Sequence, residues 1–146
     1  MTPDDALLIK ELRRDEGVEY SPYFDTVGIS TVGVGHNLKA KPLPHGWRYP
    51  LTDAQVNELL ANDLQTVFDG LDRELPWWRK LDYARQRVIC NLAFNLGIKG
   101  LLGFKNTLAA MAQGRYSAAG AGMAASKWAT QVGARADRLV DLMVNS

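Results

Sequence analysis

The chain has 146 residues, of which 47% are apolar, a net charge of +1 and a single cysteine. This apolar content is enough to build a core without disulfide bonds, so Cys90 is interpreted as a buried apolar thiol. No apolar stretch reaches the ~18 residues of a membrane span, and the acidic N-terminus does not resemble a signal peptide. We therefore expect a soluble globular protein without stable membrane insertion.

Charge is divided unevenly along the chain. Residues 1–75 contain 7 Lys and Arg against 13 Asp and Glu, whereas residues 76–146 contain 10 against 3. This division suggests an acidic half with working carboxylates and a basic half that could meet an anionic polymer, although solvated faces that happen to segregate would look the same. Lys and Arg form no run and no nucleic-acid motif is present, so nucleic acid is not an expected partner. Two histidines and one cysteine without clustered spacing predict no metal site.

The first predicted element is a helix that begins at Thr2 as N-cap, carries Pro3 at its first position and ends at Gly17. Leu8 and Leu12 lie four residues apart on one face, and Glu16 is the next member of that series. A carboxyl group that follows an apolar stripe to the end of a helix is a candidate for chemistry.

The second predicted element is an antiparallel hairpin, in which EYSPYF turns through DTVG into ISTVGVG. This arrangement places Asp25 at the turn and Thr31 on the returning strand. The GVG segment lacks the third glycine of a dinucleotide fingerprint and the lysine of a phosphate loop, so it is not interpreted as a nucleotide site. Residues 37–51, with three prolines, are predicted to form an irregular connection.

The clearest helix in the sequence covers residues 52–75. Thr52 and Gln55 form a capping box, apolar residues recur at helical spacing, and Pro76 ends the helix. Such a helix is roughly 35 Å long, at ~1.5 Å per residue, and could connect two lobes.

Further helices are predicted over residues 82–97, closed by Gly97, and over the short segments 104–114, 116–129 and 134–144. The small residues at 118–125 are interpreted as close helix packing rather than low complexity. Trp77, Trp78 and Trp128 are interpreted as packing residues rather than sugar-binding residues.

The predicted fold class is α+β, mostly helical with a small antiparallel β-ribbon. We expect one domain over residues 1–146, with a small β lobe at 17–51, a long inter-lobe helix at 52–75, and a helical lobe at 76–146 that includes the N-terminal helix. A ligand cleft is expected between the ribbon and the helical lobe, because ligand sites favour such junctions.

The polar residues of the N-terminal third suit the cleavage of a glycosidic bond. An inverting glycosidase needs one carboxylic acid to protonate the leaving oxygen and one carboxylate to activate water, ~6.5–9.5 Å apart. Glu16 and Asp25 could supply these groups, and Thr31 could hold the attacking water. Their spacing in sequence does not determine the distance, and threonine is also an ordinary strand residue.

Five segments of the chain together resemble the phage-type lysozymes, the family 24 glycoside hydrolases used as tailed-phage endolysins. The segments cover nearly the whole chain in the family's order: DEG at 15–17, YFDTVGISTVGVGH at 23–36, LTDAQVNELLANDL at 51–64, LAFNLGIKGLLGF at 92–104 and SKWATQVGARADRLV at 126–140. The resemblance implies a two-lobed lysozyme that needs no cofactor and hydrolyses, with inversion, the β-1,4 bond between N-acetylmuramic acid and N-acetylglucosamine in peptidoglycan.

The resemblance also implies roles for individual residues. By motif position Glu16 is the catalytic acid, Asp25 the base or electrostatic partner, and Thr31 the water-positioning residue. The substrate-binding or supporting residues that it implies are His36, Asp63, Phe104 and Arg135, with His36 paired to Asp63 and Arg135 paired to Glu16. His36 could act as a proton shuttle, but a structural ion pair that ties the ribbon to the following helix is preferred.

The resemblance further implies where such a protein acts. Peptidoglycan is the expected partner, the protein is expected to be a monomer, and it is expected to stay in the host cytoplasm until a holin gives it access to the periplasm and cell wall. Two alternatives remain open. A lytic transglycosylase would use Glu16 alone and form an anhydro-sugar, and a non-catalytic peptidoglycan-binding or scaffold domain would keep the fold without turnover.

Overall fold

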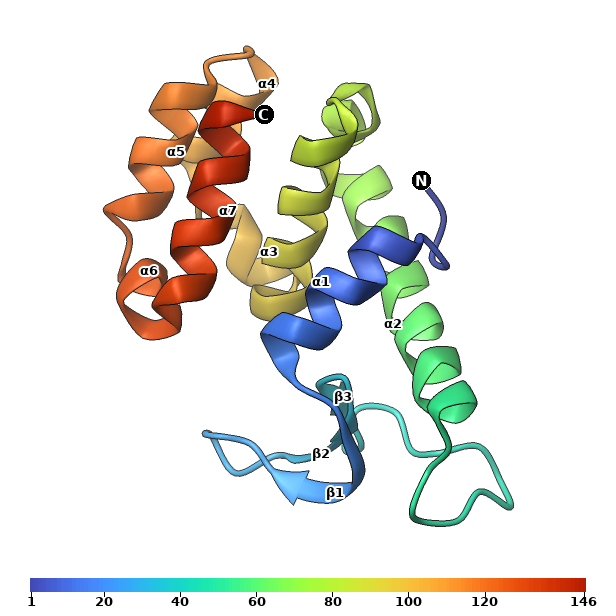
Figure 1. Ribbon diagram of the computed structural model, residues 1–146. Coiled ribbons are helices and arrows are strands. Elements are labelled where there is room, and N and C mark those ends of the chain that lie inside the picture. Colours follow the sequence, from blue (N-terminus) through green and yellow to red (C-terminus); the bar gives the residue numbers. More distant parts are fainter. The chain divides into compact units, whose positions relative to one another are not determined.

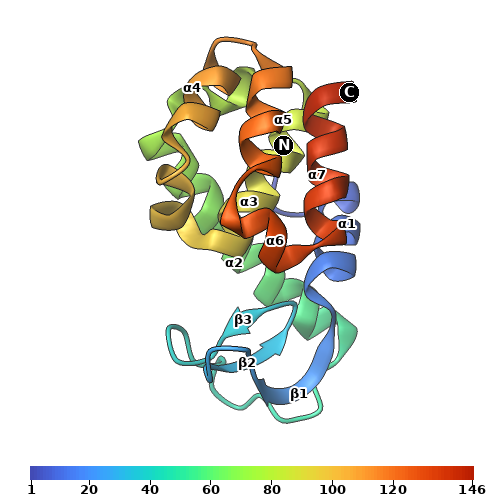
Figure 2. The same cartoon turned by 90° about the vertical axis from the view of Figure 1, so that its left-hand side faces the viewer.

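The structure is a computed structural model that describes all residues from Met1 to Ser146. The predicted α+β class is confirmed, because the chain consists mainly of helices and has one small antiparallel sheet (Figures 1 and 2). Contacts divide the chain into two compact units, Met1–Thr66 and Val67–Ser146. The elements are α1 (Ala6–Glu16), β1 (Glu19–Phe24), β2 (Ser30–Gly33), β3 (His36–Asn37), α2 (Asp53–Glu74), the 3-10 helix η1 (Pro76–Lys80), α3 (Tyr83–Leu102), α4 (Lys105–Ala112), α5 (Tyr116–Ala124), α6 (Lys127–Val132) and α7 (Ala134–Asn145).

Helix α1 begins later than the sequence predicts. Its N-cap is Asp5, whose carboxylate accepts a hydrogen bond from the Leu8 N–H at 2.9 Å. The prediction of Thr2 as N-cap was wrong, because the Thr2 hydroxyl donates to the Asp4 carboxylate and the Thr2 carbonyl accepts from the Asp5 N–H in a preceding turn. A charged carboxylate is a strong acceptor for the unpaired N–H groups of a first turn, so Asp5 takes the cap.

The sheet has the strand order β1-β2-β3, with both pairs antiparallel (Figure 2). The predicted hairpin of β1 and β2 is confirmed, and Tyr23 lies directly opposite Thr31 in its register. The short strand β3 was not predicted, and it removes Asn37 from the expected irregular connection. It pairs His36 with Val32, so the histidine enters the sheet instead of following it.

Helix α2 begins with the predicted capping box. The Gln55 N–H donates to the Thr52 hydroxyl oxygen at 3.1 Å, and the Thr52 N–H donates to the Gln55 side-chain oxygen at 3.0 Å. Within the first unit the buried residues of α2 recur at helical spacing and form its apolar face: Val56, Leu59, Leu60 and Leu64. The long helix predicted from the sequence is therefore confirmed to within one residue at each end.

In the second unit, α5 packs between α4 and α7, and α5 and α7 run side by side (Figures 1 and 2). A methyl group at Gly120 would overlap the Val144 side chain of α7, and one at Gly122 would lie 2.5 Å from the Thr107 hydroxyl of α4. The small residues of this segment therefore allow close helix packing, which confirms the prediction. The segment 116–129 divides into α5 and α6 because the Ser126 side chain starts a new helix by accepting from the Ala129 N–H.

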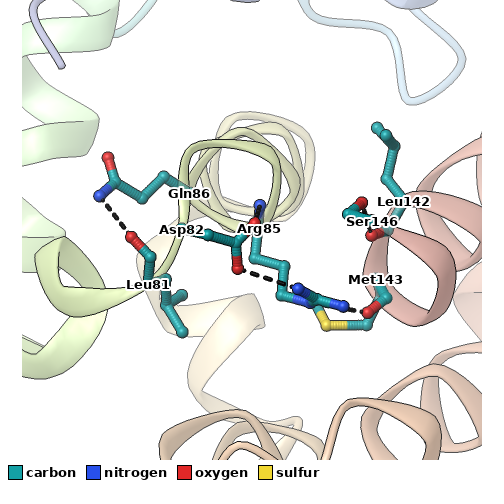
Figure 3. Close-up of polar contacts among 7 residues, drawn as sticks. All are labelled: Leu81, Asp82, Arg85, Gln86, Leu142, Met143 and Ser146. Carbon is teal, nitrogen blue, oxygen red and sulfur yellow. Dashed lines mark hydrogen bonds and ion pairs between the residues drawn. The ribbon is translucent and has the colours of Figure 1, made fainter.

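Arg85 joins three helices of the second unit. Its Nε donates to the Met143 carbonyl of α7 at 2.8 Å, and a terminal nitrogen donates to the Asp82 carboxylate at 3.0 Å (Figure 3). Its guanidinium also lies 3.7 Å from the ring centroid of Tyr116, at the start of α5. These partners stabilise a buried cation and connect α3 to the α5–α7 pair.

The regular part of α3 ends where the sequence predicts. Gly97 has φ of +73°, a left-handed conformation that glycine adopts without strain, and a further helical turn then reaches Leu102. Cys90 lies on α3 with no exposed surface, which confirms the interpretation of a buried thiol. No helix by itself has the length and apolar character needed to cross a membrane; α3 and α4 have them only jointly, across a bend of 108°.

Trp78 belongs to the core of the second unit, as predicted. It has no exposed surface, its ring centroid lies 5.4 Å from that of Phe68, and its Nε1–H donates to the Asp72 carboxylate at 2.7 Å. The same carboxylate accepts from Arg79, and the hydrogen bond from Arg79 is the main reason why the pKa of Asp72 is lowered. Trp78 therefore combines apolar burial with a satisfied indole donor.

Candidate active site

Glu16 is the last residue of α1, as the sequence predicts. Gly17 follows it with φ of +76°, and the Gly17 N–H closes the helix by donating to the Arg13 carbonyl at 3.0 Å. Leu8 and Leu12, on the preceding turns, have no exposed surface, whereas Glu16 is half-buried. The buried stripe anchors α1, and the glycine terminates it so that Glu16 stands where the chain turns toward β1.

Asp25 organises the tip of the β1–β2 hairpin. Its Oδ1 accepts hydrogen bonds from the Val27 N–H at 3.0 Å and the Ile29 N–H at 2.8 Å. The Asp25 backbone closes the same turn, because its N–H donates to the Ile29 carbonyl and its carbonyl accepts from the Gly28 N–H. One oxygen of the carboxylate is thus used to hold the turn, and the second oxygen, Oδ2, makes no hydrogen bond within the unit.

Thr31 is buried on β2 beside this turn. Its hydroxyl donates to the Ile29 carbonyl at 2.8 Å, so the position of the hydroxyl proton is determined by the backbone. The lone pairs of the Thr31 oxygen remain able to accept a hydrogen bond. Ile29 therefore links Asp25 and Thr31, since its N–H binds the carboxylate and its carbonyl binds the hydroxyl.

Tyr23 lies in the combined electrostatic field of three carboxylates. Burial raises the pKa of Tyr23, and the negative charges of Glu16, Glu19 and Asp25 raise it further. Both predicted catalytic carboxylates thus raise the pKa of the same phenol group. Sequence reasoning missed Tyr23, although its position two residues before Asp25 in an alternating strand could have indicated it.

The His36–Asp63 pair that the resemblance implies is present. His36 Nδ1 lies 2.7 Å from Asp63 Oδ2, and His36 Nε2 lies 2.7 Å from the Lys41 carbonyl oxygen. Both partners are acceptors, so both ring nitrogens carry hydrogen when both bonds form. Burial of the ring opposes its charge, but the bond to Asp63, the attraction of that carboxylate and the Lys41 carbonyl together raise the pKa of His36. The pair connects β3 to α2.

A second polar network connects the last turn of α1 to α2 and was not predicted from the sequence. Arg13 donates to the Asn57 side chain at 2.9 Å and to the Asp53 carboxylate at 3.1 Å, and the Tyr20 hydroxyl of β1 donates to the same carboxylate. The hydrogen bonds from Tyr20 and Arg13 lower the pKa of Asp53. Arg13 is one turn before Glu16, so this network restrains the end of the helix that carries Glu16.

The remaining predicted residues lie in the second unit. Phe104 contacts Trp128 edge to face, with ring centroids 6.4 Å apart, and Trp128 Nε1–H donates to the Asn95 side chain at 2.7 Å. Arg135 is buried and donates through Nε to the Asn91 side chain at 2.9 Å. Trp128 is buried, contacts Phe104 and has its indole donor satisfied by Asn95, so it is a packing residue, as predicted. The pairing of Arg135 with Glu16 and a substrate role for Phe104 stay predictions.

Comparison with known proteins gives a consistent set of relatives. The family model described as Phage lysozyme matches residues 13–142. The endolysin of Salmonella phage P22 is 33% identical over 97 residues, which are 65% of this chain and 64% of the endolysin. The pre-baseplate central spike protein of Enterobacteria phage T4 is 27% identical over 160 residues, which cover 91% of this chain and 27% of the spike protein. Probable T4-type lysozyme 1 of Dictyostelium discoideum is 24% identical over 154 residues, 90% of each chain.

The matched region and the fold agree. The chain spans about a quarter of the spike protein and slightly less than two thirds of the endolysin, but nearly all of the Dictyostelium protein. The family match begins at Arg13, three residues before Glu16. It includes the β1–β2 hairpin and the His36–Asp63 pair. The mostly helical α+β architecture with one small antiparallel sheet agrees with the fold class that the resemblance implies. The chain belongs to the phage lysozyme family.

Proposed function

We propose that this chain is a muramidase, which hydrolyses the β-1,4 bond between N-acetylmuramic acid and N-acetylglucosamine in bacterial peptidoglycan with inversion. Membership of the phage lysozyme family supports a glycoside hydrolase of the lysozyme class. The observation that carries the finer assignment is the arrangement of Asp25 and Thr31. One carboxylate oxygen is held by the turn, the other has no bond within the unit, and the neighbouring hydroxyl has already committed its proton.

This arrangement suits the activation of a water molecule. A water between Asp25 Oδ2 and the Thr31 oxygen would donate one hydrogen to each acceptor and direct a lone pair toward the anomeric carbon. As the new carbon–oxygen bond forms, Asp25 takes the proton from the water. Glu16, as the acid, gives its proton to the glycosidic oxygen while the old carbon–oxygen bond breaks. Attack from the face opposite the leaving group inverts the anomeric configuration.

The assignment is tested with purified Gram-negative peptidoglycan. Wild type should lower turbidity and release new reducing ends, whereas Glu16→Gln and Asp25→Asn should lose most of that activity while keeping the melting temperature and circular dichroism of the folded protein. Glu58→Gln is the matched control, because it removes an exposed carboxylate from the second turn of α2 in the same unit. Wild type that binds the wall but releases no sugar would instead indicate a non-catalytic binding domain.

Product analysis separates hydrolysis from the transglycosylase alternative. A hydrolase adds one water to the cleaved strand, whereas a transglycosylase leaves an anhydro-sugar, so the product masses differ by one water. Proton NMR of fresh product reports the first anomer formed and tests inversion. The pairing of a carboxylate with a hydroxyl acceptor at Asp25 and Thr31 favours hydrolysis, because a transglycosylase activates no water.

A second candidate function follows from one comparison. The match to the pre-baseplate central spike protein covers 91% of this chain and suggests a lysozyme unit that works within a phage particle. Mass spectrometry of purified particles, with the host lysate as reference, decides between the two. Peptides of this chain in the particles favour the spike-borne role, and peptides in the lysate alone favour an endolysin.

For the endolysin role we propose that the protein acts as a monomer and waits in the host cytoplasm until a holin opens the inner membrane. Expression without a holin should leave cells intact, and chemical permeabilisation of the inner membrane should then lyse them. Lysis by expression alone would contradict holin dependence, and a dimer in sedimentation analysis would contradict the monomer.

A further inference from the structure

Tyr23 shares a face of the hairpin with the candidate catalytic residues. It lies directly opposite Thr31 in the register of β1 and β2, and side chains of opposed residues point to the same face of a sheet. Asp25 follows two residues later, where the strand enters the turn. Phe24 alternates to the other face, opposite Ser30. The fields of Glu16 and Asp25 at the phenol agree with this placement.

Around Asp25 and Thr31 the donors of the turn are already committed. The Asp25 carboxylate acts as an acceptor, and the nearby N–H groups of Val27 and Ile29 already donate to it. The Thr31 hydroxyl donates its proton to the Ile29 carbonyl. The Tyr23 hydroxyl has no hydrogen-bond partner within the unit, so its O–H is an available donor beside the acceptors Asp25 and Thr31.

Tyr20, on the same strand, shows the contrasting case. Its hydroxyl donates to Asp53 and joins the network that restrains α1, so its role is accounted for within the protein. Tyr23 is half-buried, yet its hydroxyl is not used in the same way. Tyrosine is an ordinary strand residue, but its apolar ring explains strand preference and packing without using the hydroxyl.

We propose that Tyr23 is a substrate-binding residue whose phenol O–H donates a hydrogen bond to an oxygen of the glycan held beside Asp25 and Thr31. Glycans present hydroxyl, ring and acetamido carbonyl oxygens as acceptors, and the neutral phenol can donate to any of them. The inference rests on the proposed glycosidase function, which it deepens by naming a contact to the sugar.

The surroundings of Tyr23 keep it in the donating form. Burial and the three neighbouring carboxylates raise the pKa of Tyr23 above its ordinary value of 10.0, so the phenol stays protonated through neutral and mildly alkaline pH. The half-buried ring also offers an apolar surface for the C–H groups of a pyranose.

The test removes the hydroxyl and keeps the ring. Tyr23→Phe, the control Tyr49→Phe and wild type are compared by initial rates of reducing-end release from soluble peptidoglycan strands over a range of concentrations. Tyr49 is an exposed tyrosine outside the sheet. We expect kcat/KM of Tyr23→Phe to fall about three- to ten-fold, the range for one neutral hydrogen bond, with Tyr49→Phe unchanged. Thermal unfolding verifies that all three proteins fold alike.

A binding measurement separates this inference from the proposed function. Dissociation constants for an N-acetylglucosamine oligomer are compared between Glu16→Gln and the double variant Glu16→Gln/Tyr23→Phe by calorimetry. Weaker binding by the double variant supports the sugar contact even if wild type cleaves nothing, in which case only the muramidase proposal fails. Equal kcat/KM for wild type and Tyr23→Phe, together with equal binding by the two Glu16→Gln proteins, would overturn the role of Tyr23 and leave the muramidase proposal standing.

Discussion

Replacing His36 with asparagine is expected to reduce stability far more than catalysis. The His36 ring has only 2% of its side chain exposed and bridges Asp63 on α2 and the Lys41 carbonyl, both at 2.7 Å. Asparagine is too short to reach both acceptors from the same backbone position. The variant therefore loses a tie between β3 and α2, while the Asp25 turn and Thr31 keep their own hydrogen bonds.

The size of the effect can be worked from these contacts. A hydrogen bond to a charged group contributes about 1.5–3 kcal/mol, and both of these bonds involve the charged ring. Asp63 keeps 24% of its side chain exposed, so water can replace part of the hydrogen bond that its carboxylate loses in the variant. The lower end of this energy range is therefore expected for each bond. We expect a loss of about 3 kcal/mol in the free energy of unfolding. For a chain of this size, this corresponds to a fall of roughly 6–12 °C in melting temperature.

The loss should depend on pH with a defined sign. The pKa of His36 is raised above its ordinary value of 6.5, because the partners of the ring outweigh its burial. A group whose pKa is higher in the folded state adds stability that is complete below the unfolded pKa and disappears as pH rises through the folded pKa. The difference between wild type and His36→Asn should therefore be largest at acidic pH, below about 6, and shrink toward alkaline pH.

The assay is urea unfolding followed by circular dichroism, at pH values from mildly acidic to mildly alkaline. His45→Asn is the control, because His45 is the only other histidine and is exposed. Turnover per folded molecule is measured in parallel. An equal loss of stability at all pH values would refute the charged pair, and a normal melting temperature with lost activity would refute the structural role and favour a proton shuttle.

Three further predictions concern helix packing, a helix cap and the burial of the thiol. Gly120→Ala should lower the unfolding free energy by about 1 kcal/mol, because the overlap with Val144 exceeds the gain in helix propensity, and Val144→Ala in the same background should recover part of the loss in thermal melts. Thr52→Ala should lower the free energy of unfolding by about 1 kcal/mol, because α2 loses its N-cap. The effects of Thr52→Ala and Gln55→Ala should not be fully additive, because both residues belong to one capping box. Urea unfolding midpoints of the single and double variants measure this coupling. Cys90 should react with a thiol reagent only as fast as the protein opens, so a fast reaction in native buffer would contradict its burial.

Much of the local structure could be predicted because its signals act over a few residues. The capping box at Thr52, the glycine after Glu16 and the turn at Asp25 each depend on hydrogen bonds between near neighbours, and the structure has all three. The start of α1 was predicted wrongly for the same kind of reason. Thr2 and Asp5 both offer local caps, and the sequence pattern does not rank them.

The sequence alone is enough to order the main helices and the β1–β2 hairpin, to recognise the resemblance to phage lysozymes and to locate Glu16, Asp25 and Thr31 along the chain. The folded chain adds that His36 joins a third strand, that Arg13 is held by α2, and that Tyr23 lies opposite Thr31 with its hydroxyl uncommitted. These facts depend on strand register and on contacts between residues distant in sequence, which side-chain periodicity does not specify. A shift of one residue in the register would turn Tyr23 to the other face of the sheet, because side chains alternate along a strand.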